Sequence, residues 1–238
     1  MIESTADTVN NGIPARSGGP GAGRAPEAWP DRLVARLDRS LRRWYGIADG
    51  RRPCPAAAPA DPPAPALDPE QRRVSQGLMR VNHAGEVCAQ GLYRGQAAAA
   101  RGRRARQLFR EAAAEERDHL AWCRERLYGL GASPSRLGPC WHFGSFAIGL
   151  LVGAVGGDRR SLGFMAETER QVLDHLRRHL RRLPAPDAPS RVILQQMIEE
   201  EAAHGASARE AGGVAPNAAG RRLMRLCAKI MTASAYWL

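Results

Sequence analysis

The sequence has few of the residues that build sheets and disulfide frameworks. Aromatic residues make up only 5% of its 238 residues, and runs of β-branched residues are scarce, which argues against a β-sandwich or barrel. Its five cysteines are odd in number and include no CxxC pair, so neither a disulfide framework nor a thiolate zinc site has support. No repeat of fixed period is visible, which argues against a solenoid. Alanine and arginine dominate instead, and both favour helices.

The balance of charged and apolar residues narrows the class further. Hydrophobic residues make up 44%, enough for a packed core, so wholesale disorder is excluded. Thirty-five basic residues against 24 acidic ones give a net charge of +11, which allows an anionic partner such as nucleic acid or a phospholipid surface. The first residues, MIESTADTVNNG, are polar and lack an apolar segment. We therefore expect no secretory signal and a reducing compartment on the cytosolic side.

Proline divides the chain into two parts. Eleven of the 17 prolines lie at or before Pro69, and none occurs from Glu70 to Ser133. Residues 1–66 are therefore predicted to be a largely disordered extension rich in Pro, Ala and Gly. Within it, residues 30–47 show one apolar face among arginines, which predicts a basic amphipathic helix. That helix would lie on a membrane surface or pack on its own domain, and the sequence favours neither.

From residue 67 to residue 238 the pattern predicts one all-α domain. Apolar residues recur with helical spacing, and Gly or Pro interrupts the pattern between segments. Ser190 and Asn217 are expected to cap two of the helices. The predicted helices span about 68–100, 104–129, 141–156, 159–183, 190–211 and 217–236.

Residues 137–157 contain no Asp, Glu, Lys or Arg. Ser145, Gly149, Gly153 and Gly157 recur every four residues, so a helix here would carry a ridge of small residues that permits close helix contact. The segment is long enough to span a bilayer by length alone. Two interpretations follow from the residues: a buried core helix, or a helix lying in a membrane interface.

Two ExxH pairs, Glu116–His119 and Glu201–His204, mark a candidate metal site. A spacing of three places both side chains on one helix face, because the helix turns once per about 3.6 residues. Each pair can bind one metal ion. Di-iron carboxylate bundles combine two such pairs with one glutamate from each of two further helices.

Glu86 and Glu169 are the candidates for those two further glutamates. Each lies within a predicted helix among small or apolar residues, and the chain order is then E, ExxH, E, ExxH. A buried carboxylate without a cation would be costly. Glu167 is less suitable because it would point to another face, and Glu200 because no histidine follows it by three. His83 is expected to support the site rather than bind metal.

The segments RVNHAGEVCAQGLYRGQ and GFMAETERQVLDHL, together with the two ExxH pairs, resemble the demethoxyubiquinone hydroxylase family of ubiquinone biosynthesis. The resemblance covers roughly residues 67–238. It implies a ferritin-like bundle with two irons that hydroxylates a polyprenylated methoxy-methyl-benzoquinol, demethoxyubiquinol, with O2. It further implies a first iron held by Glu86, Glu116 and His119, and a second by three more ligands, with Glu116 and Glu201 bridging. The ligands of the second iron would be Glu169, Glu201 and His204.

A polyprenylated substrate would be dissolved in the bilayer, so the enzyme would meet the membrane. If residues 137–157 crossed the bilayer, the ligand helices on either side would be separated. We therefore predict a hydrophobic crossover helix that packs on the bundle and dips into one leaflet, flanked by Arg136, Arg159 and Arg160 at lipid phosphates. The protein would then be peripheral, on the cytoplasmic face of the cell membrane. The expected membrane contacts are Trp141, Phe143, Phe146, Ile148, Leu150 and Leu151.

Other functions fit the sequence less well. A soluble ferritin-like protein that oxidises iron or reduces peroxide shares the ligand set but gives no reason for the uncharged crossover. A nucleic-acid-binding protein accounts for the charge but not for the paired ExxH helices, and few aromatic residues are present to stack on bases, so no nucleic acid is expected as a partner. A lipid-binding accessory protein would not need the ligands. The sequence leaves open whether NADH or a reductase supplies electrons, and whether the chain forms homo-oligomers.

Overall fold

A computed structural model describes residues 50–56 and 66–237 of this protein. The predicted helix at 30–47 lies outside the described residues. Across them the structure is helical, as predicted, and contains no strand. The helices are α2 (Pro69–Ala99), α3 (Arg103–Gly129), α4 (Gly138–Arg182), α5 (Ala188–Glu210) and α6 (Ala218–Trp237).

Side-chain caps explain where several helices begin. Asp68 caps α2 in a capping box with Gln71, and Pro69 occupies the first turn, where its missing N–H costs nothing. The cap of α5 is Asp187, whose carboxylate accepts from the backbone N–H of Ser190 at 3.1 Å. The expectation that Ser190 itself is the cap was wrong. The helix begins two residues earlier, at Ala188, because a proline is tolerated in the first turn of a helix.

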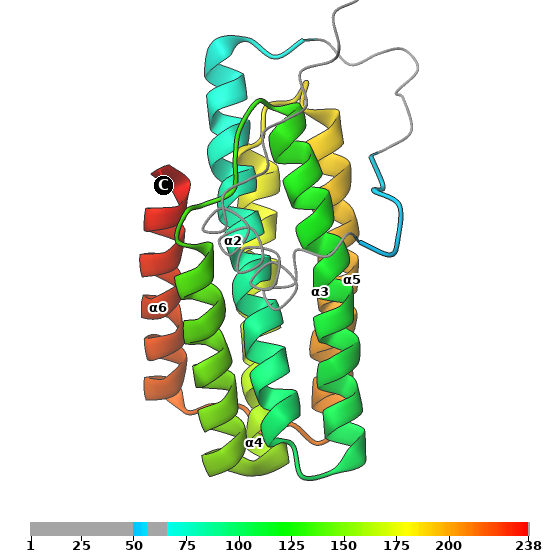
Figure 1. The fold of residues 1–238 in the computed structure, drawn as a ribbon, viewed down its shortest axis with the longest axis vertical. Helices are drawn as coiled ribbons and strands as arrows, with labels where there is room; N and C mark the ends of the chain where they lie inside the picture. The colour runs from blue at the N-terminus through cyan, green and yellow to red at the C-terminus, as the bar shows by residue number, and fades with distance from the viewer. Residues whose placement is uncertain (1–49, 57–65, 238) are drawn as a thin grey trace, which may run out of the picture. The chain divides into compact units, whose positions relative to one another are not determined.

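The long helix α4 is two helices joined at a sharp turn. Gly157 has φ of +66° and ψ of −180°, a backbone conformation that residues other than glycine rarely adopt. The chain reverses there, so the first half of α4 (138–156) and the second half (158–182) run in opposite directions (Figure 1). This turn matches the predicted break between two helices.

Four helices form the bundle: α2, α3, the second half of α4, and α5. The buried apolar side chains of these four segments meet in two clusters along its length. The first half of α4 and α6 lie outside the four, beside one another and against α2 (Figure 1). This arrangement is that of a ferritin-like bundle with an added crossover helix.

The ridge of small residues on the crossover helix faces α2. Cβ atoms built at Gly149 and Gly95 would lie 2.1 Å from the carbonyl oxygen of Leu92 and 2.2 Å from that of Phe146, so the two backbones are almost in contact. The opposite side of the first half of α4 carries large apolar residues that are exposed. These are Phe143, Ile148, Leu150, Leu151 and Val155. The segment is thus a packed helix on one face only.

A buried histidine makes the fold sensitive to acid. The Nδ1 of His179 on α4 lies 2.8 Å from the side-chain amide oxygen Oδ1 of Asn82. Burial, with His175 and Arg182 nearby, lowers the pKa of His179 to about 2. In the unfolded chain a histidine has a pKa of about 6.5, so below that pH it binds a proton that His179 does not bind in the folded protein. The contribution of His179 to stability is therefore fully present above about pH 6.5 and is lost as the pH falls below it.

We expect this histidine to contribute a loss of up to about 1.4 kcal/mol per pH unit below about pH 6. The free energy of unfolding of metal-free His179→Gln, measured in urea, should fall less steeply than that of the parent between pH 6 and pH 4. The difference in slope should correspond to the uptake of about one proton on unfolding, whatever the stability of the variant at pH 7. Identical slopes for the variant and the parent would show that His179 is protonated in the folded state.

Candidate metal centre

The six side chains singled out in the sequence lie together in the middle of the bundle. Glu86 comes from α2, Glu169 from the second half of α4, and one ExxH pair each from α3 and α5. Every one of them is buried, with relative exposures between 0% and 8%. Helices far apart in sequence thus bring their polar residues to one point inside an apolar bundle.

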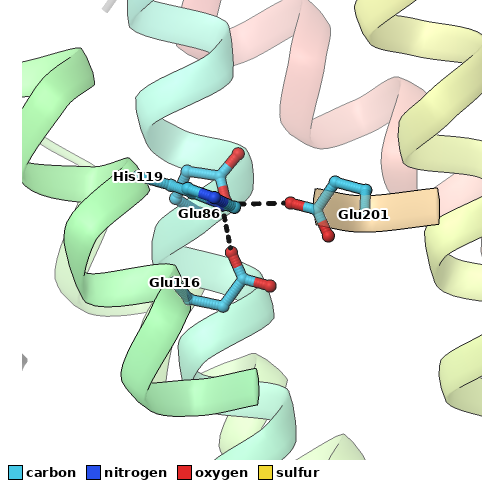
Figure 2. Close-up of side chains that lie close together, drawn as sticks. All are labelled: Glu86, Glu116, His119 and Glu201. Atoms are coloured by element: carbon cyan, nitrogen blue, oxygen red, sulfur yellow. Dashed lines mark hydrogen bonds and ion pairs between the residues drawn. The ribbon is translucent and has the colours of Figure 1, made fainter. Parts of the chain in front are cut away.

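The six fall into two groups that share members. One group is Glu86, Glu116, His119 and Glu201, and the other is Glu116, Glu169, Glu201 and His204. Within each group the candidate ligand atoms lie within 4.8 Å of one another. Figure 2 shows the first group, with the carboxylates of three helices turned toward the His119 ring. Glu116 and Glu201 belong to both groups, which is the arrangement expected of bridging carboxylates.

The two histidines present the same nitrogen to the centre. The Nδ1 of His119 lies 3.1 Å from both Glu116 and Glu201. The Nδ1 of His204 lies 3.1 Å from Glu201 and 3.9 Å from Glu169. Both imidazoles therefore offer Nδ1 as the ligand atom, and Nε2 points away from the centre.

Each Nε2 meets a glutamate from the other ExxH helix. His119 Nε2 lies 2.7 Å from Glu200 on α5, and His204 Nε2 lies 2.9 Å from Glu115 on α3. A carboxylate can only accept, so each Nε2 carries a hydrogen, and each Nδ1 is left to bind a metal once its own proton is released. Sequence reasoning missed both residues. Their signal was the doubled glutamate, Glu115–Glu116 and Glu200–Glu201, at the head of each ExxH pair.

Tyr93 is a further member of the site. Its ring is fully buried, and its hydroxyl donates a hydrogen bond to Glu169. Burial and the nearby carboxylates, Glu169 foremost, raise the pKa of this phenol well above its ordinary value, so it keeps its proton. It was not among the predicted ligands, and its signal in the sequence is the spacing of two turns after Glu86.

Four buried carboxylates in so small a volume require positive charge. Burial, and then the neighbouring carboxylates, raise the pKa of Glu86 and of Glu169 well above the ordinary range. At His204 burial opposes protonation, yet hydrogen bonds to Glu115 and Glu201 raise its pKa to about 11. The metal-free centre thus collects protons to offset its charge.

Divalent cations meet that requirement better than protons do. Two such ions carry the charge that balances four carboxylates, and carboxylate with imidazole is a donor set suited to iron or manganese. One oxygen of Glu116 is buried with no hydrogen-bond partner among the described residues, as expected of an atom reserved for a metal. The residues present therefore fit a two-metal centre.

Two other sequence candidates lie apart from the centre. Glu167 pairs with Arg170 at 2.7 Å and with Gln171, so it faces away, as predicted. His83 is buried, and its Nε2 has no hydrogen-bond partner among the described residues. Burial lowers its pKa to about 4, so it is a neutral side chain, and no contact supports the expected role beside the metal.

Residues 73–235 match the family model described as ubiquinone biosynthesis protein COQ7. The chain is also similar to curated proteins named 3-demethoxyubiquinol 3-hydroxylase. It is 58% identical to the one from Bordetella parapertussis over 208 residues, 87% of this chain and 92% of the relative. Identity to the Burkholderia lata protein is 51%, again over 87% of this chain and over 99% of the relative.

These matches are longer than the predicted catalytic domain. The aligned stretch of 208 residues is longer than residues 67–238, so the similarity extends to residues before 67. The likeness had been expected to stop near residue 67. Part of the Pro-rich extension is thus shared with these relatives.

Proposed function

Because this chain belongs to the COQ7 family of ubiquinone biosynthesis proteins, we propose that it hydroxylates the ring of a polyprenylated methoxy-methyl-benzoquinol with O2. Relatives that are 51% and 58% identical over 208 aligned residues, nearly their whole length, are named for that reaction. The observation that carries the proposal is the pair of buried four-residue groups that share Glu116 and Glu201. Such a centre could hold the metal ions with which a monooxygenase activates O2.

We propose that two iron ions occupy the centre. Glu86 and His119 would hold one and Glu169 and His204 the other, with Glu116 and Glu201 between them. Iron supplies the electrons and the open coordination positions that O2 activation requires. The ions would then balance the charge of the four carboxylates, and the protons that Glu86, Glu169 and the two histidines hold in the metal-free protein would be released.

The surrounding residues prepare the ligands. Glu115 and Glu200 hold the histidine rings with Nδ1 turned inward, so little reorganisation is needed when metal binds. Tyr93 fixes one oxygen of Glu169 through its hydroxyl. The six ligands are themselves buried in the bundle, so bulk water is largely kept from the centre.

Isotope labelling tests the proposed reaction. Iron-loaded protein, a short-chain demethoxyquinol and a reductant (NADH, or NADH with a reductase) are incubated under 18O2. We expect one 18O atom in the new ring hydroxyl, because one oxygen enters the ring and the other leaves as water after two electrons are supplied. A soluble iron-oxidising or peroxide-reducing protein would consume O2 or peroxide and leave the quinol unlabelled.

We also propose that the enzyme meets its lipid substrate at a membrane surface formed by the first half of α4 and by α6. The two helices lie side by side (Figure 1), and each carries several large apolar residues that are exposed. On α6 these residues are Leu223, Leu226, Ile230 and Trp237, at 55% to 77% exposure. Its opposite face packs on the bundle through Met231 and Ala235.

The charges near this surface support an anionic lipid partner. Arg159 and Arg160 lie just past the turn at Gly157, and α6 carries Arg222 and Lys229 among its exposed residues. Basic residues at a membrane surface contribute about 1 kcal/mol each with anionic lipid. Of the most apolar stretch of α4, only 17% is buried, whereas a core helix would be mostly buried. Because the helix packs along α2, it would lie in one leaflet on the cytoplasmic side.

A charge on this surface should weaken membrane binding. Leu151, on the first half of α4, is 63% exposed. Leu151→Glu would remove an apolar contact with lipid worth about 2 kcal/mol and would place a negative charge against the membrane. We expect flotation with phosphatidylglycerol-containing liposomes to fall about tenfold or more, with metal content unchanged. The matched control is Val192→Glu on the outer face of α5, at 39% exposure. Equal losses in both variants, or none in either, would contradict the proposed surface.

A further inference from the structure

Residues 50–56 form a segment without helix that precedes α2 and packs on the bundle near the metal centre. The backbone N–H groups of Arg51 and Arg52 donate to Oδ1 of Asp118 on α3, at 2.5 and 3.4 Å. Farther along, Cys54 and Ala56 pack against the second apolar cluster. Asp118 is 4% exposed, so this segment supplies the partners for a nearly buried carboxylate.

Arg52 joins α3 to α5 through its guanidinium group. Its Nε donates to Asp118 Oδ2 at 2.8 Å, and its two terminal nitrogens donate to the two oxygens of Glu200 at 2.7 and 2.8 Å. The guanidinium carbon lies 4.9 Å from the centre of the Trp122 ring, whose Nε1 donates to the Arg52 carbonyl at 3.3 Å. A planar fork with this many fixed donors is specific to arginine.

The contact continues from Arg52 to the metal centre. The same oxygen of Glu200 that accepts from Arg52 Nη2 lies 2.7 Å from His119 Nε2. On the other side of that ring, Nδ1 faces Glu86, Glu116 and Glu201. Only one carboxylate thus separates Arg52 from a proposed ligand.

The corresponding carboxylate at the other histidine is less enclosed. Glu115, which meets His204 Nε2, has a side chain that is 45% exposed, whereas that of Glu200 is 13% exposed. His119 is fully buried, and the side chain of His204 is 10% exposed. The 50–56 segment therefore covers one half of the centre and not the other.

We propose that Arg52 is a positioning residue for the metal centre: by fixing Glu200 it holds the His119 ring, so the two metal positions differ in strength. This inference rests on the proposed metal centre. It also gives the segment before the helical domain a role in the site, although residues 1–66 had been predicted to be a largely disordered extension. The position that contains His119 is the tighter of the two, and the position that contains His204 is the more exchangeable.

Anaerobic titration of the metal-free full chain with Co2+ tests the inference, because the visible bands of the ion report its ligand geometry. We expect two equivalents in the parent. In Arg52→Ala, one of the two should bind about tenfold more weakly or worse, with altered bands. Arg52→Lys should lie between, because an ammonium group cannot span both carboxylates. The matched control is Arg51→Ala, which keeps the backbone N–H that contacts Asp118 and should titrate like the parent.

A double-mutant comparison tests the route through Glu200. Glu200→Gln alone should also weaken one equivalent, and adding Arg52→Ala to it should cause little further loss. Full additivity, a titration of Arg52→Ala identical to that of Arg51→Ala, or equal weakening of both equivalents would overturn the inference. Circular dichroism checks folding, and if Arg52→Ala is unfolded, Arg52→Lys decides alone. A parent that binds no Co2+ would instead refute the metal centre itself.

Discussion

Replacing Glu201 with alanine should abolish binding of both metal ions and, with it, hydroxylation. Glu201 belongs to both four-residue groups, and its carboxylate lies 3.1 Å from Nδ1 of each histidine. A residue shared by two positions cannot be lost from one alone. We expect iron content to fall from two per chain to near zero and turnover to fall by at least about 10³-fold, since the chemistry requires the metal. Helix content should be largely kept.

Two comparisons make this result specific. Glu199→Ala removes an exposed glutamate two residues away and should leave iron content unchanged. His204→Ala should also abolish turnover. It should lose iron mainly from the position that contains Glu169 and His204, because His204 belongs to that group only. Normal quinol turnover by Glu201→Ala and His204→Ala would show that the ligand assignment is wrong.

Gly149→Ala should cause a large loss of stability for so small a change. The added Cβ would lie 2.1 Å from the carbonyl oxygen of Leu92 and 3.1 Å from the backbone nitrogen of Gln96. Both neighbours are backbone atoms of α2, so no side chain can rotate away and the two helices must separate. Overpacking typically costs about 1–3 kcal/mol, and we expect the free energy of unfolding to fall by about 3 kcal/mol.

Gly144→Ala is the matched control on the same helix. A Cβ there meets nothing within 4 Å, so the alanine should stabilise the helix by about 0.5–1 kcal/mol relative to glycine. Urea unfolding of both metal-free variants measures the difference. A similar shift for both would show that the first half of α4 is not held close to α2.

Most of the helical framework could be predicted from the sequence. The predicted bounds agree with the described helices to within about three residues, because Gly and Pro interrupt the apolar pattern at each turn. The largest difference is at the crossover helix, which begins at Gly138 rather than near 141. Pro139 lies before the predicted start, but a proline in the first turn is compatible with a helix.

The six candidate ligands were found because their signal is local. An ExxH pair lies on one helix, so its spacing alone places the two side chains together. The partners of those ligands were missed because their signal is not local. Whether Glu200 meets His119 depends on the register of α3 against α5, and Arg52 comes from a Pro-rich stretch without periodicity. The sequence contains such contacts only through the tertiary packing.

The central claim is that two metal ions share Glu116 and Glu201. Mössbauer spectroscopy of protein reconstituted with 57Fe and oxidised tests it most directly. We expect two irons per chain in one magnetically coupled, diamagnetic pair, since bridging ligands couple neighbouring ferric ions. One iron per chain, or two that behave as isolated paramagnetic ions, would contradict it.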